Sequence, residues 1–438
     1  MTDGGDTGPA TGPDTDGDAD AGYWSGPWPG EDGGPRRLGV PADGSPTPAV
    51  GANAAVDVVS RTDPLVTMVV TRDPGQVYLL RNGMGPDATC SVEQVDPDTL
   101  ATVADSGPLA GGPMWPGGLA AHANGSLYVV FGNHAHRLDA ELRVLASAEL
   151  PLHRPYNSFV ILPDGTLVTK DFAGSLPGAP VAPEARVPCE LVALEPDALT
   201  VMDRIALPEP SIARISSDGA HVYVVGDTSL LRVGWSGGFV PDPGFRSPYR
   251  TEEGQTYGWD CVLALGAAWF LDNGDGSTNF DGTFRGKGVS TTPLQVIRVD
   301  LADGSVSTTA VCDAVGGLIT NPPMVDVGRR IVVGYDSGNG VMAAFDIADD
   351  GALTPRWRRD HDHAAHLLLL PVAGALVTGD HDRERMVEQV VVVDIATGVE
   401  LARTDTEGPL QSAVFPALGW DATVYWCSLS TVSRLRFV

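Results

Sequence analysis

The sequence predicts an all-β chain, folded as a β-propeller from one repeated hairpin. The clearest copy spans 156–171, where the apolar run 159–162 ends in the turn Pro163-Asp164-Gly165 and a second alternating run leads back. Seven further copies occur, at 67–83, 120–132, 213–227, 260–274, 323–338, 366–380 and 413–428. A hairpin that recurs along a chain is the signature of a repeat architecture.

The repeats predict eight four-stranded blades. A third and a fourth strand, joined by an Asp-containing turn, follow the hairpin at 93–104, 192–203, 297–308, 344–355 and 392–403. The last repeat has only three strands, whereas a short β-like run at 55–60 precedes the first full repeat. Pairing of the N-terminal with the C-terminal strand would complete the last blade and leave no open sheet edge. Seven blades are the alternative, if two short repeats merge.

The chain divides into a tail and one large domain. Residues 1–53 are mostly Gly, Pro, Asp and Thr with few aliphatic side chains, which predicts a disordered tail, and 54–438 form the propeller. The aromatic residues Tyr23, Trp24 and Trp28 could instead dock this tail on the domain or on a partner.

Composition limits the partners. A net charge of −28, from 56 acidic and 28 basic residues, would repel nucleic acid and anionic lipid. Five cysteines without a CxxC spacing are expected to be buried thiols. Neither an export signal nor an apolar run of membrane-spanning length occurs, so we expect a soluble, cytoplasmic monomer without nucleic-acid or membrane partners.

The candidate site is the mouth of the central channel. The innermost strand of each blade lines this channel, so the residues that begin these strands converge at one face. They are read as Asp63, His122, Asn157, Arg214, Asp260, Asn321, His366 and Ser412. Such a polar ring predicts either a metal or polar-substrate site or a water-filled channel.

We assign roles to the residues of this ring from the chemistry of their side chains. His122 and His366 would move protons, and Asn157, Arg214 and Ser412 would bind substrate. Asp260, Asn321 and Asn157 would hold a divalent metal, calcium or zinc, because carboxylate and amide oxygens coordinate such ions.

Two further stretches are candidate metal sites. The insertion 271–292 carries Asp272, Asp275 and Asp281 among glycines, so it could be a calcium loop, although the spacing is not that of an EF-hand, and an exposed loop that covers the channel mouth is the favoured alternative. Histidines two residues apart share one face of a strand, so His134 with His136, or His361 with His363, could supply two ligands to zinc or iron. The alternative for 361–363 is a solvated turn.

The segments 297–308 and 392–403 resemble the repeats of the pyrroloquinoline-quinone-like (PQQ-like, quinoprotein dehydrogenase-like) β-propeller superfamily. In both, a strand ends in Asp, and a short Asp-Gly or Thr-Gly turn follows. The usual Trp after the turn is Thr308 in one segment and Leu401 in the other, and the vicinal cysteine pair of the quinone-dependent alcohol dehydrogenases is missing. The resemblance therefore implies the fold, and PQQ itself is not expected.

The stretch Arg154-Pro155-Tyr156-Asn157, followed by LPDGTLVTKD, is similar to one blade of the gluconolactonase and regucalcin-like propellers. This resemblance implies that Asn157 faces metal or substrate, that Asp260 matches their Asp ligand and that Asn321 takes the place of their second Asn. The early Glu ligand of those six-bladed proteins is not found.

Three functions follow. The first is a metal-assisted enzyme, hydrolase- or lactonase-like, acting on a small polar substrate at the channel mouth. The alternative is a non-catalytic scaffold that binds a protein partner, and the third is a quinone-dependent oxidoreductase. Motifs for nucleophilic serine hydrolysis and nucleotide binding are absent from the sequence.

Overall fold

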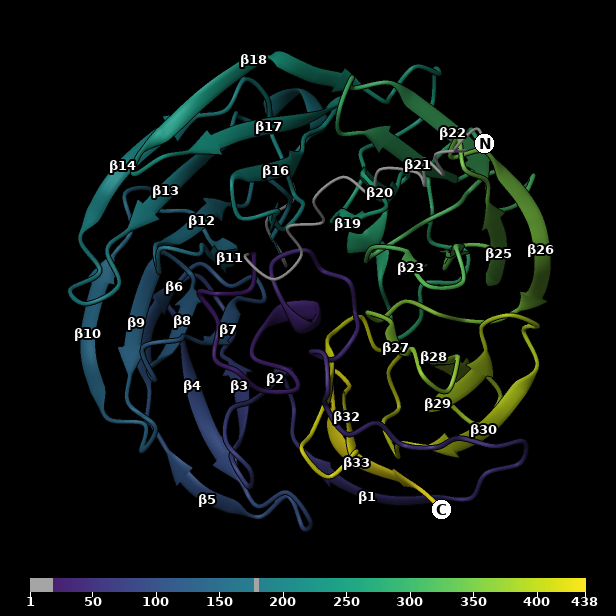
Figure 1. Ribbon diagram of the computed structural model, residues 1–438, viewed down its shortest axis with the longest axis horizontal. Coiled ribbons are helices and arrows are strands. Elements are labelled where there is room, and N and C mark those ends of the chain that lie inside the picture. Colours follow the sequence, from purple (N-terminus) through teal and green to yellow (C-terminus); the bar gives the residue numbers. More distant parts are fainter. Residues whose placement is uncertain (1–18, 177–180) are drawn as a thin grey trace, which may run out of the picture.

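The computed structural model describes residues 19–176 and 181–438 and arranges eight antiparallel sheets around one axis (Figure 1). Each sheet has four strands, apart from one with a fifth strand at its side. The predicted eight-bladed propeller is therefore confirmed, and the seven-bladed alternative is wrong. Among the described residues, no helix is long and apolar enough to span a membrane.

Blades 1–4 occupy the first half of the chain, and their strands are given from the axis outward. Blade 1 has β2 (Val66–Thr71), β3 (Val77–Asn82), β4 (Ala88–Val95) and β5 (Thr102–Asp105), with β6 (Leu109–Gly112) pairing β4; blade 2 has β7 (Gly118–Ala121), β8 (Leu127–Phe131), β9 (His134–Leu138) and β10 (Val144–Glu149); blade 3 has β11 (Tyr156–Ile161), β12 (Leu167–Asp171), β13 (Glu190–Leu194) and β14 (Val201–Ala206); blade 4 has β15 (Ser216–Ser217), β16 (His221–Val225), β17 (Ser229–Trp235) and β18 (Phe239–Pro248).

Blades 5–8 complete the ring. Blade 5 has β19 (Val262–Ala264), β20 (Ala267–Leu271), β21 (Gln295–Asp300) and β22 (Val306–Ala310); blade 6 has β23 (Met324–Asp326), β24 (Ile331–Asp336), β25 (Val341–Ile347) and β26 (Leu353–Asp360); blade 7 has β27 (Leu368–Leu370), β28 (Ala375–Asp382), β29 (Val387–Asp394) and β30 (Glu400–Asp405); blade 8 has β31 (Pro416–Leu418), β32 (Val424–Cys427), β33 (Thr431–Phe437) and β1 (Val56–Thr62). Short 3₁₀ turns lie at η1 (Glu31–Gly33), η2 (Pro183–Ala185) and η3 (Ser277–Asn279).

The ring closes as predicted. Strand β1 pairs antiparallel with β33, from Val56 opposite Phe437 to Thr62 opposite Thr431 (Figure 1). The outermost strand of blade 8 therefore comes from the N-terminal part of the chain, and closure leaves no gap between the first and last blades.

Burial falls from the axis to the rim. Every residue of β2, β11 and β12 is buried, because their two faces pack against neighbouring blades. The outer strands β10 and β14 have no fully buried residue and alternate between exposed and half-buried positions. The core is therefore a series of apolar layers between blades.

The predicted disordered tail differs most from the structure. Residues 1–18 lie outside the described residues, but 19–53 pack against the propeller, and Trp28 is only 1% exposed. In Figure 1 this purple segment crosses the centre of the ring. We call residues 19–40 the axial plug. Its composition misled the prediction because hydrogen bonds and ion pairs, rather than aliphatic side chains, hold it in place.

Candidate functional site

The axial plug bonds to the inner strands of six blades. Tyr23 accepts a hydrogen bond from the Ile161 amide through its hydroxyl oxygen, at 3.0 Å. Five further inner-strand amides donate to plug carbonyl oxygens: Thr71 to Trp28 (2.9 Å), Ala121 to Pro29 (2.7 Å), Ser217 to Pro35 (2.8 Å), Leu263 to Arg36 (3.0 Å) and Leu369 to Gly39 (2.8 Å). All of these bonds lie toward the ends of the inner strands, so the plug closes that end of the channel.

Arg37 of the plug supplies the positive charge at the axis. It is 2% exposed, and its guanidinium group donates to the carboxylates of Glu31 and Asp32 and to Ser158 Oγ at 2.8 Å. Burial would lower the pKa of Arg37, but Glu31, Asp260 and Asp32 together raise it. A guanidinium group of the chain itself therefore neutralises the acidic groups at the axis.

Two residues of the predicted polar ring hold the plug. His366 Nδ1 lies 2.8 Å from Asp32 Oδ1, and Arg214 Nη1 lies 3.1 Å from Glu31 Oε1. Burial opposes ionisation of Asp32, but His366 and Arg37 hold its pKa below the usual value. The ring of His366 stacks on Phe415 at 3.7 Å between centroids, and Arg214 lies 4.6 Å from the same ring.

Three other ring residues join neighbouring blades. Asn157 Nδ2 donates to Ile212 O at 2.9 Å, and Asn321 Nδ2 donates to Ala364 O at 2.5 Å. The Arg214 amide donates to Asp260 Oδ1 at 2.6 Å. Each bond ties the start of one inner strand to the chain entering the next blade. Within the described part of the chain, Asn157 Oδ1 and Asp260 Oδ2 are buried acceptors without a hydrogen-bond partner.

The remaining three predicted residues have local partners. Asp63, which precedes β2, accepts from Arg81 Nε at 2.9 Å. Ser412 donates to Cys427 O within blade 8, at 2.8 Å. His122 does not begin an inner strand, since β7 ends at Ala121, and it lies in the following turn at the plug end of the channel. Its Nε2 lies 2.9 Å from Gly165 O, and its Nδ1 accepts from the Asn124 amide. The sequence interpretation placed this strand too late, so His122 is not near His366.

The proposed calcium loop has separate partners for each acid. Asp272 accepts from the Gln295 amide and from Gln255 Nε2, both at 2.7 Å, and burial raises its pKa to about 7. Asp275 accepts from the Gly276 amide, and Asp281 pairs with Lys287. In residues 19–176 and 181–438, no group of three or more His, Cys, Asp or Glu side chains is placed to hold a metal ion. Calcium and zinc binding stay predictions.

The two histidine pairs differ in their surroundings. His134 and His136 contact the backbone carbonyls of Gly111 and Ala110, at 2.6 and 2.7 Å. His361 and His363 instead lie beside a hollow of about 450 Å³ near the end of β28. Its lining consists of Arg285, Asp360, His361, Asp362, Asp380, His381, Arg383 and Glu384, and we call it the blade-7 hollow.

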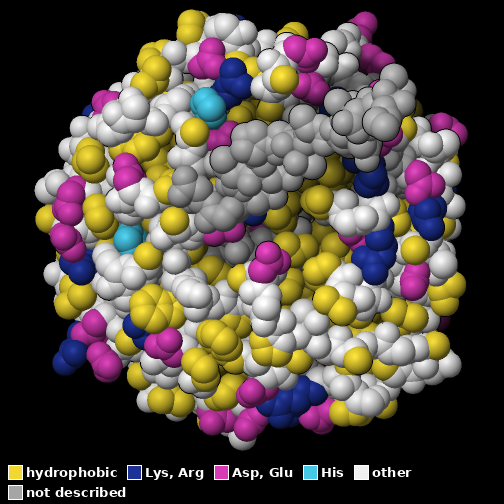
Figure 2. All heavy atoms as spheres, viewed as in Figure 1, with side chains coloured by type: hydrophobic (Ala, Val, Ile, Leu, Met, Phe, Trp, Pro, Cys, Tyr) yellow, Lys and Arg dark blue, Asp and Glu magenta, His cyan; other side chains and the backbone are white. Residues whose placement is uncertain are grey.

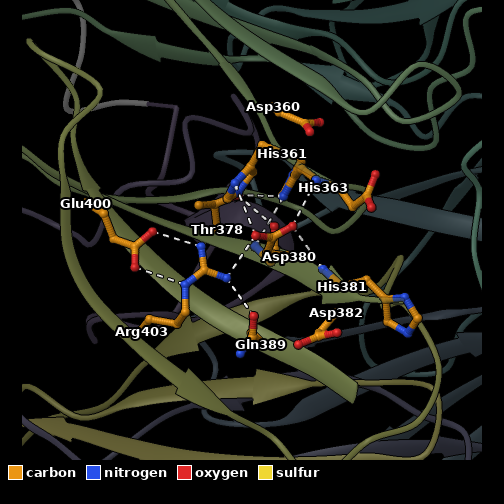
Figure 3. A network of polar contacts seen from close by, with 12 residues as sticks. Asp360, His361, His363, Thr378, Asp380, His381, Asp382, Gln389, Glu400 and Arg403 are labelled. Carbon is orange, nitrogen blue, oxygen red and sulfur yellow. Dashed lines mark hydrogen bonds and ion pairs between the residues drawn. The ribbon is translucent and has the colours of Figure 1, made fainter. Parts of the chain in front are cut away.

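Thr378 of β28 links the two buried histidines beside the hollow. The Gly379 amide donates to His363 Nδ1, so this nitrogen is an acceptor, and the Thr378 hydroxyl donates to it at 2.7 Å. His361 Nε2 lies 3.2 Å from Thr378 Oγ1. Figure 3 shows Asp380 between this pair and Arg403, whose Nη1 donates to Asp380 Oδ2 at 2.9 Å. Burial lowers the pKa of His361 to about 4 and that of His363 to about 3.

Sequence analysis missed the residues that build both regions. Glu31, Asp32 and Arg37 lie in the segment predicted to be disordered, although Arg36 and Arg37 are the only basic residues among the first 53. That pair beside Glu31-Asp32 was the available signal. Thr378 and Asp380 lie two residues apart on β28 and so share one face of that strand, whereas Arg285 comes from a distant segment, and no spacing rule predicts that it meets them.

No protein-family model matches this chain, and no curated protein sequence matches it. Solved structures do. Quinohemoprotein alcohol dehydrogenase ADHIIG from Pseudomonas putida HK5 gives a TM-score of 0.58 at 10% identity, over 95% of this chain and 80% of that one. BamB from Moraxella catarrhalis gives a TM-score of 0.55 at 12% identity, over 88% of this chain and 98% of that one.

These likenesses show the fold. Together with the eight four-stranded blades, they show that the chain shares the β-propeller fold of these proteins. The resemblance of the segments 297–308 and 392–403 to that superfamily is thereby confirmed at the level of fold. Identity of 10 to 12% does not extend the partners or cofactors of those proteins to this chain.

Proposed function

We propose that this chain is a recognition scaffold, a propeller that binds a protein partner, and that its axial ring serves the fold rather than catalysis. The observation that carries the proposal is the pairing of the ring inside the chain. Arg214 and His366 face the plug, and Asn157, Asp260 and Asn321 bond the backbone of adjoining blades. A catalytic chamber needs polar groups directed at a substrate, whereas these groups are directed at the chain itself.

Exposed aliphatic side chains on the rim favour a partner surface. The second residue of the outer strand in each of blades 1–4 is an exposed aliphatic side chain: Val103 (60%), Leu145 (51%), Met202 (48%) and Val240 (47%). We call these four residues the apolar arc. In Figure 2, hydrophobic side chains lie between acidic ones along the left rim, where Figure 1 places β5, β10 and β14. The matching positions of blades 5 and 6 are the polar residues Ser307 and Thr354.

The partner should have a surface complementary to this arc. Aliphatic side chains surrounded by carboxylates, on a chain with a net charge of −28, suit an apolar patch bordered by Lys and Arg. The apolar contact would supply affinity, and the charges would speed association at low salt.

Site-specific photo-cross-linking in the cells that produce the protein tests this function. A benzophenone amino acid is placed at position 145 or 202, and at Val372 as the matched control, since Val372 is an 87% exposed aliphatic residue on blade 7. The proposal expects the same polypeptide to be captured from 145 and 202 and not from 372. Capture of different polypeptides, or equal capture from 372, would contradict it.

A metal-assisted activity at the channel mouth is the second candidate. It is favoured by Asn157 Oδ1 and Asp260 Oδ2, two of the predicted metal-ligand atoms, which are buried acceptors without a hydrogen-bond partner among the described residues. Arg37 would have to withdraw for a cation to take its place. Calorimetric titration of wild type and Arg37→Met with Ca²⁺ and Zn²⁺ tests this candidate, which requires stoichiometric binding that Asp260→Ala abolishes.

A further inference from the structure

The blade-7 hollow contains buried hydrogen-bond acceptors that have no donor. His361 is 2% exposed and His381 is 4% exposed, and both line the hollow. Among the described residues, neither His361 Nδ1 nor His381 Nδ1 has a hydrogen-bond partner. A buried polar atom without a partner costs stability, so a pair of them in one hollow calls for an explanation.

Neighbouring groups decide which protonation state these nitrogens have. His381 Nε2 lies 3.1 Å from Pro409 O, and a carbonyl oxygen only accepts, so Nε2 holds a proton and, in the neutral ring, Nδ1 carries the lone pair. The Thr378 hydroxyl donates to His363, so its oxygen is free to accept from His361 Nε2–H. The Nδ1 atoms of His361 and His381 are therefore both acceptors in the neutral rings.

Donors already present in the hollow are used elsewhere. Arg285 donates to Asp362 and Asp360, and Arg383 Nε lies 3.2 Å from Asp362 Oδ2. Arg403 donates to Asp380 from behind. The lining holds four carboxylates but only two guanidinium groups, so it is acidic overall. The hollow therefore has more hydrogen-bond acceptors than donors and more negative than positive charge.

We propose that the blade-7 hollow binds a small organic cation with N–H donors, of the aliphatic amine class. An ammonium group has three N–H donors and one positive charge, which match the lone pair of a buried imidazole and the acidic lining. His361 Nδ1 lies 3.7 Å from Asp380 Oδ2, so one ammonium group can face both. The hollow of about 450 Å³ is large enough for a chain of several carbons. This site is separate from the apolar arc and does not depend on the scaffold function.

Calorimetric titration of the full-length protein with 1,4-diaminobutane tests the proposal, with 1,4-bis(trimethylammonio)butane as the matched ligand that has both positive charges but no N–H donor. Diaminobutane is expected to bind with one site, and the trimethylammonio compound at least about tenfold more weakly. His381→Phe removes one acceptor at similar size and should weaken diaminobutane binding about tenfold, the loss of one charge-assisted hydrogen bond. His134→Phe, on blade 2, is the control and should bind as wild type does.

Glu384→Gln is a second variant that keeps the proposal testable if His381→Phe does not fold. Glu384 is exposed and lines the hollow. The substitution should weaken diaminobutane binding several-fold through the loss of charge. The proposal is overturned by equal binding of the two ligands, by unchanged affinity in both variants or by no diaminobutane binding. Zn²⁺ that binds at one site and is lost in His381→Phe, without any amine binding, would replace the amine with a metal and overturn it too.

Discussion

The axial plug and the blade-7 hollow are built from the same kinds of side chains, His, Asp and Arg, but differ in how these are paired. In the plug, Arg37 contacts Glu31, Asp32 and Ser158, and His366 faces Asp32. In the hollow, the Nδ1 atoms of His361 and His381 lack a hydrogen-bond partner within the described structure.

This difference in pairing distinguishes groups that stabilise the fold from groups that are available to bind a ligand. Burying a charged group costs free energy unless the group is paired. A cluster whose charges are paired within the chain therefore needs no ligand, and losing one partner destabilises the folded protein. Acceptors left without donors add nothing to the folded state, so natural selection for stability alone would not retain them. The comparison therefore predicts large stability effects at the plug and small ones at the hollow.

Deletion of residues 1–40 should have the largest effect. It removes the bonds to six inner strands and leaves Arg214 and His366 buried without their carboxylates. We expect a loss of roughly 5–10 kcal/mol in the free energy of unfolding, or failure to fold. Thermal unfolding measures it, and the synthetic peptide 19–40 added in trans should raise the melting temperature again. A change of only a few degrees in the melting temperature would instead support the predicted disordered tail.

Arg37→Met is the next largest change. It leaves Glu31, Asp32 and Asp260 without their buried cation, which should cost about 3–5 kcal/mol in urea denaturation. Arg36→Met is the matched control, because Arg36 pairs with Asp20 at 3.5 Å in a partly exposed contact. Surface pairs contribute about 0–1 kcal/mol. Equal losses in both variants would mean that the plug is held by its backbone bonds alone.

Stability should fall as pH rises from 6.5 to 8 because of Glu388. Burial raises its pKa in the folded state to about 8, against the ordinary 4.5, so between these values the folded protein holds a proton that the unfolded chain has released. The loss should be about 2 kcal/mol over this range, with Asp272 adding in the same direction up to its pKa of about 7. His361 and His363, whose pKa values are lowered, act in the opposite direction, mainly below pH 6.5 and with a small remainder above it.

Glu388→Gln checks the pH dependence, since a glutamine cannot ionise but can still accept from the Ser412 amide. Denaturation curves at pH 6.5 and 8 should then differ much less than those of wild type. An unchanged difference would assign the effect to other groups.

Asp260→Ala should cost about 1–2 kcal/mol, because the Arg214 amide loses its buried acceptor. Asp260→Asn keeps that acceptor oxygen and serves as the control in the same denaturation experiment. Full stability of Asp260→Ala, together with a loss of bound metal, would instead support the metal-ligand prediction made from the sequence.

The sequence predicts the periodic parts of this molecule and not its long-range contacts. Alternating hairpins and the run 55–60 specify blades and closure locally, because each strand needs a partner for its edge. Arg37 and Asp260 lie 223 positions apart in the sequence, so no spacing rule predicts that they come together. His122 shows a second limit, since a shift of a few residues moves a side chain from one end of an inner strand to the other.

Glu384→Gln should have the smallest effect on stability and so gives the sharpest form of the comparison. Glu384 is exposed, so the change should alter the free energy of unfolding by less than about 0.5 kcal/mol. Thermal unfolding should show a melting temperature within about 2 °C of wild type. The same variant is expected to bind diaminobutane several-fold more weakly, so ligand binding and stability would change independently at the hollow, whereas at the plug Arg37→Met lowers stability directly. A marked drop in melting temperature for Glu384→Gln would show that the hollow also belongs to the paired framework of the fold.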